Sequence, residues 1–336
     1  MKAIGFKKSL AIDATDSLFE FETERPVPGP RDLLVRIAAA SVNPADAKIR
    51  IRAAQAELET PLIIGFDAVG VVEALGDDVE GFAVGDRVYY AGDVKRPGSN
   101  AEYQLVDYRI AAVAPASLSD AEAAVLPLTA LTGWEALFDR LRINPKKDKG
   151  RTLLIIGGAG GVGSITTQLA KQLTDLTVIA TASRPETEGW CREMGADHVA
   201  NHRDLLASVR ALGFDTVDYI FNTADTKGHW DAMCELIAPQ GMISSIVEFE
   251  GGVDLARLQM KSAGFVWEWM FTRSAFSTND MARQHDILVE LASLVDAGRI
   301  RTTLKETISG LSAESIIEAH RRIESGKTIG KIAVQY

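Results

Sequence analysis

The sequence predicts an α/β protein of two domains, one rich in β-strands and one built on a doubly wound parallel sheet. The 336 residues exceed one ordinary core, because single cores stop growing near roughly 250 to 300 residues. The first third contains short alternating apolar runs cut by Gly and Pro, such as LLVRIAAASV, GVVEAL and DRVYY. From residue 119 onward, short apolar strands alternate with helical stretches, which is typical of a parallel sheet covered by helices.

The individual elements follow in order along the second half of the chain. A helix is expected from Ser119, where a capping Ser and early acids precede apolar residues at helical spacing. Strands and helices then alternate through TLLIIG, SITTQLAKQL, LTVIATAS, PETEGWCREMG, DYIFNTA, GHWDAMCELIAP and GMISSI, and a last strand is expected in GFVWEWMF. We expect further elements in this order: a helix over about 281–297, a strand near TTLKETI, a helix over about 312–325 and a strand KIAVQ.

Composition limits the classes of partner. The net charge is −10 and no run of Lys and Arg forms a basic stripe, so no nucleic-acid partner is expected. No leader pattern and no uninterrupted run of about 18 apolar residues are visible, so we expect a soluble, cytoplasmic protein without membrane contact. The only cysteines, Cys191 and Cys234, cannot form a four-cysteine zinc site and suggest no disulfide scaffold.

A glycine-rich turn follows the strand TLLIIG and precedes a helix. Gly158, Gly160 and Gly163 have the GxGxxG spacing, with Gly161 and Val162 between the last two. The glycines permit a tight turn and close approach of the backbone, and the free N–H groups at the helix start attract a pyrophosphate. This pattern predicts a Rossmann dinucleotide site. A turn that only connects strand and helix is the alternative.

The end of the next strand indicates which dinucleotide binds. NAD sites usually place an acid there for the ribose 2′-hydroxyl, whereas this strand ends in TASRPE. A guanidinium with a neighbouring hydroxyl suits a 2′-phosphate, so Ser183 and Arg184 predict NADPH. A solvated loop arginine is the alternative for Arg184.

Several segments together resemble the medium-chain dehydrogenase/reductase superfamily: SVNPADAKIR, GFDAVGVV, GDRVYY, SNAEY, LPLTALTGWEAL and AGGVGSITTQLAK occur in its order. The chain most resembles the zinc-free quinone oxidoreductase branch, and within it the group labelled zinc-type alcohol dehydrogenase-like. The resemblance implies a GroES-like catalytic domain of 1–122 and 277–336 around a Rossmann domain of 123–276. It also implies a homodimer formed by pairing the last Rossmann strands, for which GFVWEWMF is the candidate.

The resemblance also indicates whether a zinc site is expected. In the zinc enzymes, a Cys in the segment corresponding to SVNPAD and a His before the acid of GFDAVG help to hold the metal. Asn43 and Phe66 stand there, and neither residue replaces a thiolate or an imidazole as a ligand. No metal site is therefore expected, and Asp67 is expected only to orient backbone groups in a turn.

Three residues of SVNPADAKIR are the candidate catalytic groups. Relatives with the VNPxDxK pattern place a lysine near the nicotinamide ribose and the substrate oxygen, which assigns this place to Lys48. Asn43 and Asp46 are implied near the nicotinamide end as hydrogen-bonding or orienting groups. The alternatives are a solvated lysine for Lys48, and turn chemistry around Pro44 for Asn43 and Asp46.

Further cofactor contacts are expected from four places. Thr132 matches a family threonine near the carboxamide, although a helix threonine bonded to its own backbone is the alternative. Lys331, in the final GKIAVQY, matches a family GK pair near the cofactor. The remaining candidates lie at the carboxyl ends of two parallel strands, where ligands bind in open α/β sheets: Asn222, Thr223, Ser245, Ile246 and Val247.

These assignments predict an NADPH-dependent oxidoreductase that reduces quinones or α,β-unsaturated carbonyls by direct hydride transfer without zinc. Two alternatives stay open. A zinc-dependent alcohol dehydrogenase would need the missing ligands. A non-catalytic NADPH-binding sensor or RNA-binding protein would share the fold without turnover.

Overall fold

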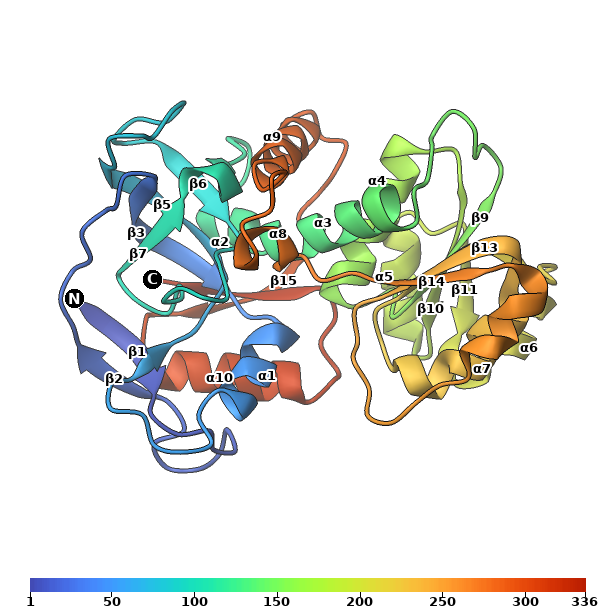
Figure 1. Cartoon of the computed structure of the whole chain (residues 1–336), viewed down its shortest axis with the longest axis horizontal. Helices are drawn as coiled ribbons and strands as arrows, with labels where there is room; N and C mark the ends of the chain where they lie inside the picture. The colour runs from blue at the N-terminus through green and yellow to red at the C-terminus, as the bar shows by residue number, and fades with distance from the viewer. The chain divides into compact units, whose positions relative to one another are not determined.

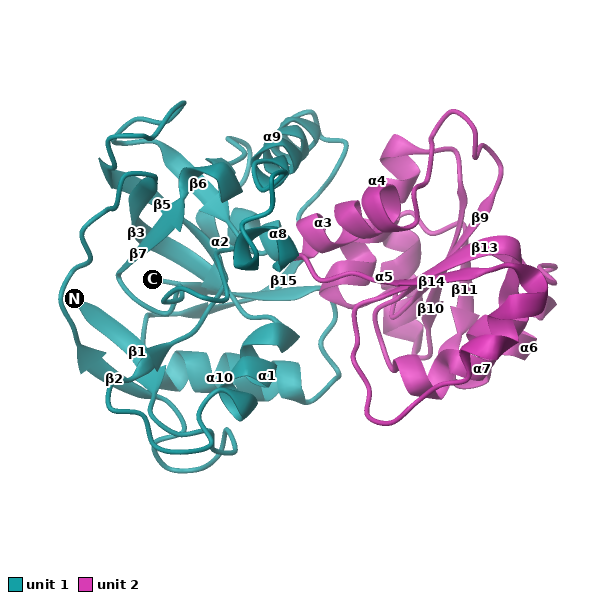
Figure 2. Ribbon diagram, in the orientation of Figure 1, with its two compact units in different colours: residues 1–128, 271–336 teal, residues 129–270 magenta.

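The chain divides into two units in the computed structural model, which describes residues 1–336. Unit 1 comprises 1–128 and 271–336, and unit 2 comprises 129–270 (Figure 2). The first boundary falls later than residue 122, because helix α2 (Asp120–Ala124) packs against strands of unit 1. The second falls earlier than residue 276, and Phe271 packs on Phe66 of unit 1 with ring centroids 4.7 Å apart.

Unit 1 contains two β-sheets, and its β-rich, mostly antiparallel character is confirmed (Figure 1). The larger sheet has the strand order β15-β16-β3-β5-β6-β8, and β7 also pairs with β3. Only β15 and β16 run parallel to each other. The smaller sheet has the order β2-β1-β4. The strands are β1 (Lys2–Phe6), β2 (Phe19–Glu22), β3 (Asp32–Ser41), β4 (Leu62–Ile63), β5 (Asp67–Leu75), β6 (Arg87–Tyr90), β7 (Tyr103–Asp107), β8 (Ala111–Val113), β15 (Leu304–Ser309) and β16 (Lys331–Gln335).

Helices of unit 1 lie around these sheets. One core cluster joins the smaller sheet to α10, through Ile4, Phe6 and Ile316. A second lies on the larger sheet and includes Leu33 and Val88. The helices are α1 (Pro44–Arg52), α2, α8 (Thr272–Ala275), α9 (Arg283–Asp296) and α10 (Ala313–Glu324), with a 3₁₀ helix at Tyr108–Ile110. The helices and strands expected after residue 280 are confirmed within a few residues.

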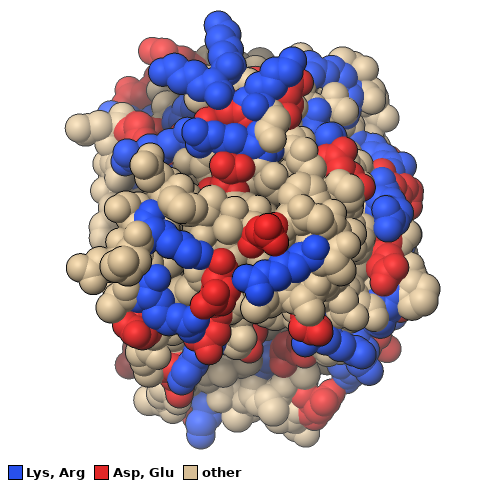
Figure 3. All heavy atoms as spheres, turned by 90° about the vertical axis from the view of Figure 1, so that its right-hand side faces the viewer, with Lys and Arg blue, Asp and Glu red and all other residues tan.

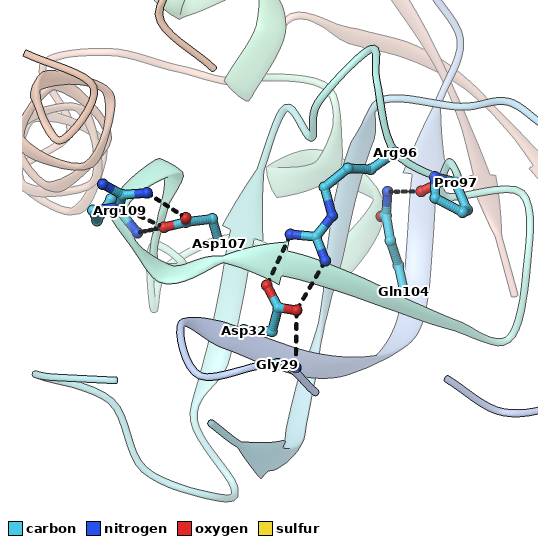
Figure 4. Close-up of polar contacts among 7 residues, drawn as sticks. All are labelled: Gly29, Asp32, Arg96, Pro97, Gln104, Asp107 and Arg109. Atoms are coloured by element: carbon cyan, nitrogen blue, oxygen red, sulfur yellow. Dashed lines mark hydrogen bonds and ion pairs between the residues drawn. The ribbon is translucent and has the colours of Figure 1, made fainter. Parts of the chain in front are cut away.

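Paired charges stabilise the start of β3. Asp32 and Asp107 lie opposite each other in the β3–β7 register. Arg96 donates two hydrogen bonds to Asp32, at 2.8 and 3.0 Å, and Asp107 accepts from Arg109 at 2.7 Å (Figure 4). Burial alone would raise the pKa of Asp32, but Arg96 and the Gly29 N–H hold it below its ordinary value. Each carboxylate therefore has its own arginine, which offsets the repulsion between the two like charges across the strands.

Unit 2 is a doubly wound parallel sheet of six strands, as the sequence predicts. The strand order is β11-β10-β9-β12-β13-β14, which is the Rossmann order. Every residue of TLLII in β9 is buried, because parallel strands are covered on both faces. Helix α3 (Pro127–Trp134) begins in the last two residues of the first segment of unit 1 and continues into unit 2. The other elements are a π-helix (Glu135–Arg140), β9 (Thr152–Ile156), α4 (Gly161–Leu173), β10 (Thr177–Ala182), α5 (Pro185–Glu193), β11 (His198–Asn201), a 3₁₀ helix (His202–Asp204), α6 (Leu205–Ala211), β12 (Val217–Asn222), α7 (Thr226–Leu236), β13 (Ile237–Ser245), a 3₁₀ helix (Leu255–Lys261) and β14 (Gly264–Trp267).

The last strand of unit 2 is shorter than expected. β14 covers only the first half of GFVWEWMF and ends at Trp267. It pairs with β13 on one side and forms the edge of the sheet.

No helix of the chain combines the length and apolar character needed to span a bilayer. On the face drawn in Figure 3, basic and acidic side chains are interspersed.

Candidate active site

The glycine turn of unit 2 forms the phosphate-binding candidate. β9 ends at Ile156, Gly157 has a φ of +87°, and Gly160 is the N-cap of α4. This positive φ favours glycine, because residues that carry a side chain rarely adopt it. The N–H groups of Gly161, Val162 and Gly163 open α4, where they lack intrahelical acceptors and can bind an anion.

Close packing explains two of the three predicted glycines. A Cβ on Gly163 would overlap the Gly157 carbonyl oxygen and lie 2.7 Å from Gly158 Cα. A Cβ on Gly158 would lie 2.7 Å from the Ala180 Cβ and 3.1 Å from Cys191 Sγ. At Gly160 the nearest atom would be 3.6 Å away, so the protein itself leaves room there. The turn therefore fits a dinucleotide, whose pyrophosphate would take up this room.

The end of β10 presents Ser183 and Arg184. Both side chains are partly exposed, and Arg184 is the N-cap residue of α5. Arg184 Nε lies 3.1 Å from Glu186 Oε1, and the Arg184 side chain is 37% exposed. The guanidinium therefore lies at the end of β10 in a partly exposed position beside the Glu186 carboxylate.

The ends of β12 and β13 are tied together by side chains. The buried Asn222 amide donates to Thr226 Oγ1 at 3.0 Å and to Ser245 Oγ at 3.1 Å. Ile246 N donates to the Asn222 carbonyl oxygen at 3.2 Å. Thr223 Oγ1 donates to the carbonyl oxygen of Ile156, directly before the glycine turn, at 2.8 Å. Asn222, Thr223, Ser245, Ile246 and Val247 therefore lie together at the carboxyl edge of the sheet.

Unit 1 holds a buried polar network around Asp67, at the start of β5. Asp67 Oδ2 accepts from Ser41 Oγ at 2.6 Å, from Asn43 Nδ2 at 2.8 Å and from Lys331 Nζ at 3.2 Å. Asp67 Oδ1 accepts from the Leu128 N–H at 2.7 Å. Asp67 is thus an ion-pair partner of Lys331 as well as a residue that orients a backbone group.

Lys331 lies at the start of β16 and is 2% exposed. Its ammonium also donates to the Val42 carbonyl oxygen at 3.0 Å and to Asn43 Oδ1. Burial lowers its pKa, while Asp67 and Asp46 oppose that shift. All three N–H bonds of Lys331 have acceptors within unit 1, so contact with a cofactor stays a prediction.

Asn43 and Asp46 begin α1 together. Asn43 is the N-cap, and its N–H donates to Asp46 Oδ2 at 2.7 Å. Asp46 Oδ1 is buried and has no hydrogen-bond partner. Burial raises the pKa of Asp46 to about 7, against the lowering effects of Asn43 and Lys331. Asp46 can therefore exist as a neutral acid near neutral pH.

The other two expected residues lie on helices. Lys48 follows Asp46 on α1 and is partly buried. Thr132 lies on α3 and is 4% exposed. The structure therefore brings Asn43, Asp46 and Lys331 into one network, with Lys48 on the same helix as Asp46.

The donor set of unit 1 does not fit zinc. Phe66 is buried and packs on Phe271, and Asn43 is engaged with Asp67 and Lys331. No group of three or more His, Cys, Asp or Glu side chains in the chain is arranged to hold a metal ion. An ammonium beside Asp67 also opposes a second cation there.

Comparison with known proteins shows the family. Residues 29–116 match the alcohol dehydrogenase GroES-like domain, and residues 194–334 match the zinc-binding dehydrogenase family. A zinc-type alcohol dehydrogenase-like protein of Staphylococcus aureus is 44% identical, over 99% of this chain and 99% of that protein. The chain belongs to the medium-chain dehydrogenase/reductase superfamily. As a member of this superfamily it is an oxidoreductase with a GroES-like domain and a Rossmann sheet.

Solved structures of the superfamily share the fold of the whole chain. A proposed zinc-dependent alcohol dehydrogenase of Rhizobium etli has a TM-score of 0.95 and 45% identity, covering 100% of this chain and 98% of its own. The Escherichia coli quinone oxidoreductase in complex with NADPH has a TM-score of 0.82 and 25% identity, covering 100% of both chains. The resemblance to this superfamily inferred from the sequence is confirmed.

Two residues of the site were not among the predicted ones. Gly157 adopts the left-handed conformation, and the doubled glycine GG at its position is a signal for such a turn. Asp67 was expected only in a backbone role, and its partner Lys331 is 264 residues away in sequence. No short-range pattern indicates such a pair.

Proposed function

We propose that this chain is an NADPH-dependent reductase of quinones or α,β-unsaturated carbonyls that works without zinc. The observation that supports the proposal is the donor set of unit 1. Asn43 and Phe66 stand where the zinc enzymes carry metal ligands, and Asp67 is ion-paired with Lys331. Negative charge on a reduced carbonyl must then be stabilised by hydrogen-bond donors or a cation. The likeness to a quinone oxidoreductase that binds NADPH supports the same assignment.

The residues have distinct parts in this reaction. Bound NADPH would supply a hydride to an electrophilic carbon of the substrate. The N–H groups of Gly161, Val162 and Gly163 hold the pyrophosphate, and Ser183 with Arg184 holds the 2′-phosphate. The Lys48 ammonium stabilises negative charge on the carbonyl oxygen in the transition state. We assign the contact with the nicotinamide carboxamide to Thr132. The contacts with the ribose of NADPH are assigned to the residues at the carboxyl ends of β12 and β13.

A substrate panel tests the proposed activity. In one assay, purified protein is mixed with NADPH and a series of quinones and enones. In a second assay, it is mixed with NADP⁺ and simple alcohols. Both are run with and without a chelator, and the change in NADPH absorbance is followed. We expect turnover of quinones or enones that the chelator does not change. Alcohol oxidation abolished by the chelator would indicate a zinc alcohol dehydrogenase instead. Tight NADPH binding with no turnover would indicate a sensor.

Arg184→Ala tests the cofactor assignment. We expect NADPH binding to weaken at least about tenfold, because a charge-assisted contact contributes about 1.5 to 3 kcal/mol. NADH binding should be nearly unchanged, since NADH lacks the 2′-phosphate. Fluorescence titration measures both dissociation constants. Arg192→Ala, on the exposed face of the same helix, is the control. Equal losses for NADPH and NADH would contradict the assignment.

We also propose a homodimer formed through the edge strand β14. Trp267, at its end, is 46% exposed, and Trp269 just beyond it is 47% exposed. An unpaired strand edge beside exposed aromatic rings favours pairing with a second copy. Light scattering should give a dimer for the unmodified protein and more monomer for Trp267→Glu. A monomeric unmodified protein at assay concentrations would rule the dimer out.

A further inference from the structure

The Lys331 ammonium and the Asp67 carboxylate contact opposite ends of one amide. Asn43 Oδ1 accepts from Lys331 Nζ, and Asn43 Nδ2 donates to Asp67 Oδ2 at 2.8 Å. Lys331 and Asp67 also contact each other at 3.2 Å. The three residues are each 2% exposed or less, so water screens these charges little.

This arrangement determines which way the Asn43 amide points. A rotation that exchanged its oxygen and nitrogen would place the NH₂ group against an ammonium and the oxygen against a carboxylate. Both contacts would then be repulsive, in a site where electrostatic interactions are strong. The charged pair therefore allows one orientation of the amide, in which one of its two N–H bonds is not used by Asp67.

The pair is itself firmly held. Ser41 Oγ and the Leu128 N–H donate to the two oxygens of Asp67, at 2.6 and 2.7 Å. The Val42 carbonyl oxygen accepts from Lys331 at 3.0 Å. Lys331 has no N–H bond left for a substrate, so any effect on a reaction must pass through its neighbours.

We propose that Lys331 and Asp67 are positioning residues, which fix the Asn43 amide so that its remaining N–H donates to the substrate oxygen during reduction. The Lys331 ammonium is thereby the positive charge of a site that has no metal ligands. This inference rests on the proposed reductase activity and adds a donor to it beside Lys48. Asn43 is the residue that contacts substrate, and the ion pair acts through Asn43.

Lys331→Met keeps the length of the side chain and removes its charge. We expect kcat to fall about tenfold or more, as for partial loss of an oxyanion donor, with the NADPH dissociation constant within about twofold of the unmodified protein. In Asn43→Ala the further change Lys331→Met should have little additional effect on kcat, because the group it positions is already gone. Lys149→Met, which removes a lysine from an exposed surface pair with Asp175, is the control. If Lys331→Met lowered kcat by the same factor in Asn43→Ala as in the unmodified protein, the two residues would act independently and the proposal would be overturned.

The double variant Lys331→Met/Asp67→Asn separates positioning from stability. Lys331→Met alone leaves a buried carboxylate without a countercharge, so it should lower the midpoint of urea unfolding. Neutralising Asp67 as well should restore most of that midpoint. Turnover should stay low, because two neutral partners no longer select one amide orientation. Recovery of kcat together with stability would show that the pair only fills the core, and would overturn the proposal.

A spectroscopic measurement keeps the inference separate from the proposed function. In a ¹⁵N–¹H spectrum, the Asn43 side-chain amide is identified by its absence in Asn43→Ala. Its signals should shift in Lys331→Met and in the double variant, and stay in place in Lys149→Met. Unshifted Asn43 signals would overturn the positioning role whatever the activity. Shifted signals in a protein that reduces no quinone or enone would retain the positioning of Asn43 and reject the reductase assignment.

Discussion

Lys48→Ala is expected to lower kcat for a quinone or enone by roughly a hundredfold, the effect of losing one oxyanion donor. As hydride reaches the substrate, charge builds up on the carbonyl oxygen, and an ammonium nearby is most useful at that moment. The dissociation constant of NADPH should therefore change much less than kcat. Steady-state kinetics with fluorescence titration of NADPH gives both quantities.

Two further variants sharpen the assignment of Lys48. Lys48→Arg should recover only part of kcat, because a planar guanidinium is larger and directs its donors differently. Arg52→Ala removes an exposed cation from the same helix, α1, and should leave kcat near its original value. A near-normal kcat in Lys48→Ala would mean that Lys48 is an ordinary solvated lysine. Asn43, ribose hydroxyls or backbone N–H groups would then have to stabilise the oxyanion.

Substitutions in the glycine turn should separate folding from cofactor binding. Gly160→Ala places its Cβ in room that the protein leaves open, so the free energy of unfolding should fall by no more than about 1 kcal/mol, the preference of an N-cap for Gly over Ala. NADPH binding should weaken by about a hundredfold. Gly163→Ala drives its Cβ into the backbone of Gly157 and Gly158, and should cost about 1 to 3 kcal/mol of stability as well as binding. Urea unfolding and fluorescence titration measure the two effects.

Gly189→Ala is the matched control for this pair. Gly189 lies in α5, and a Cβ there would meet no atom within 4 Å. The substitution should leave NADPH binding unchanged and slightly stabilise the helix. If Gly160→Ala bound NADPH as tightly as the original protein, no phosphate would occupy the room beside Gly160, and the turn would only connect β9 to α4.

The features that sequence predicts well here are local. The strand TLLII, the glycine turn and α4 follow one another without interruption, so spacing alone reveals them. The parallel sheet follows from the alternation of strands and helices in the same way. GFVWEWMF shows the limit of such patterns, because an apolar run does not reveal where pairing with β13 stops, and the strand ends at Trp267.

The features that sequence does not predict depend on distant pairings. The apolar residues after Ser119 keep helical spacing across the boundary between the two units. The pattern therefore cannot show that the first part, α2, packs in unit 1. Lys331 was expected near a cofactor, and a lysine close to the C-terminus usually lies in solvent. Its burial results from the pairing of β16 with β3, which places it beside Asn43 and Asp67.

The position of β16 has a consequence for the order of synthesis. β16 lies between β15 and β3, yet it follows the entire segment of unit 2 along the chain. While that segment emerges from the ribosome, β3 lacks its neighbour on this side and the carboxylate of Asp67 lacks its ammonium. Unit 2 is continuous and can complete its sheet first, whereas unit 1 must wait for its last strand. The closing of the larger sheet and the neutralisation of Asp67 are therefore one event, which occurs after residue 331 has been made.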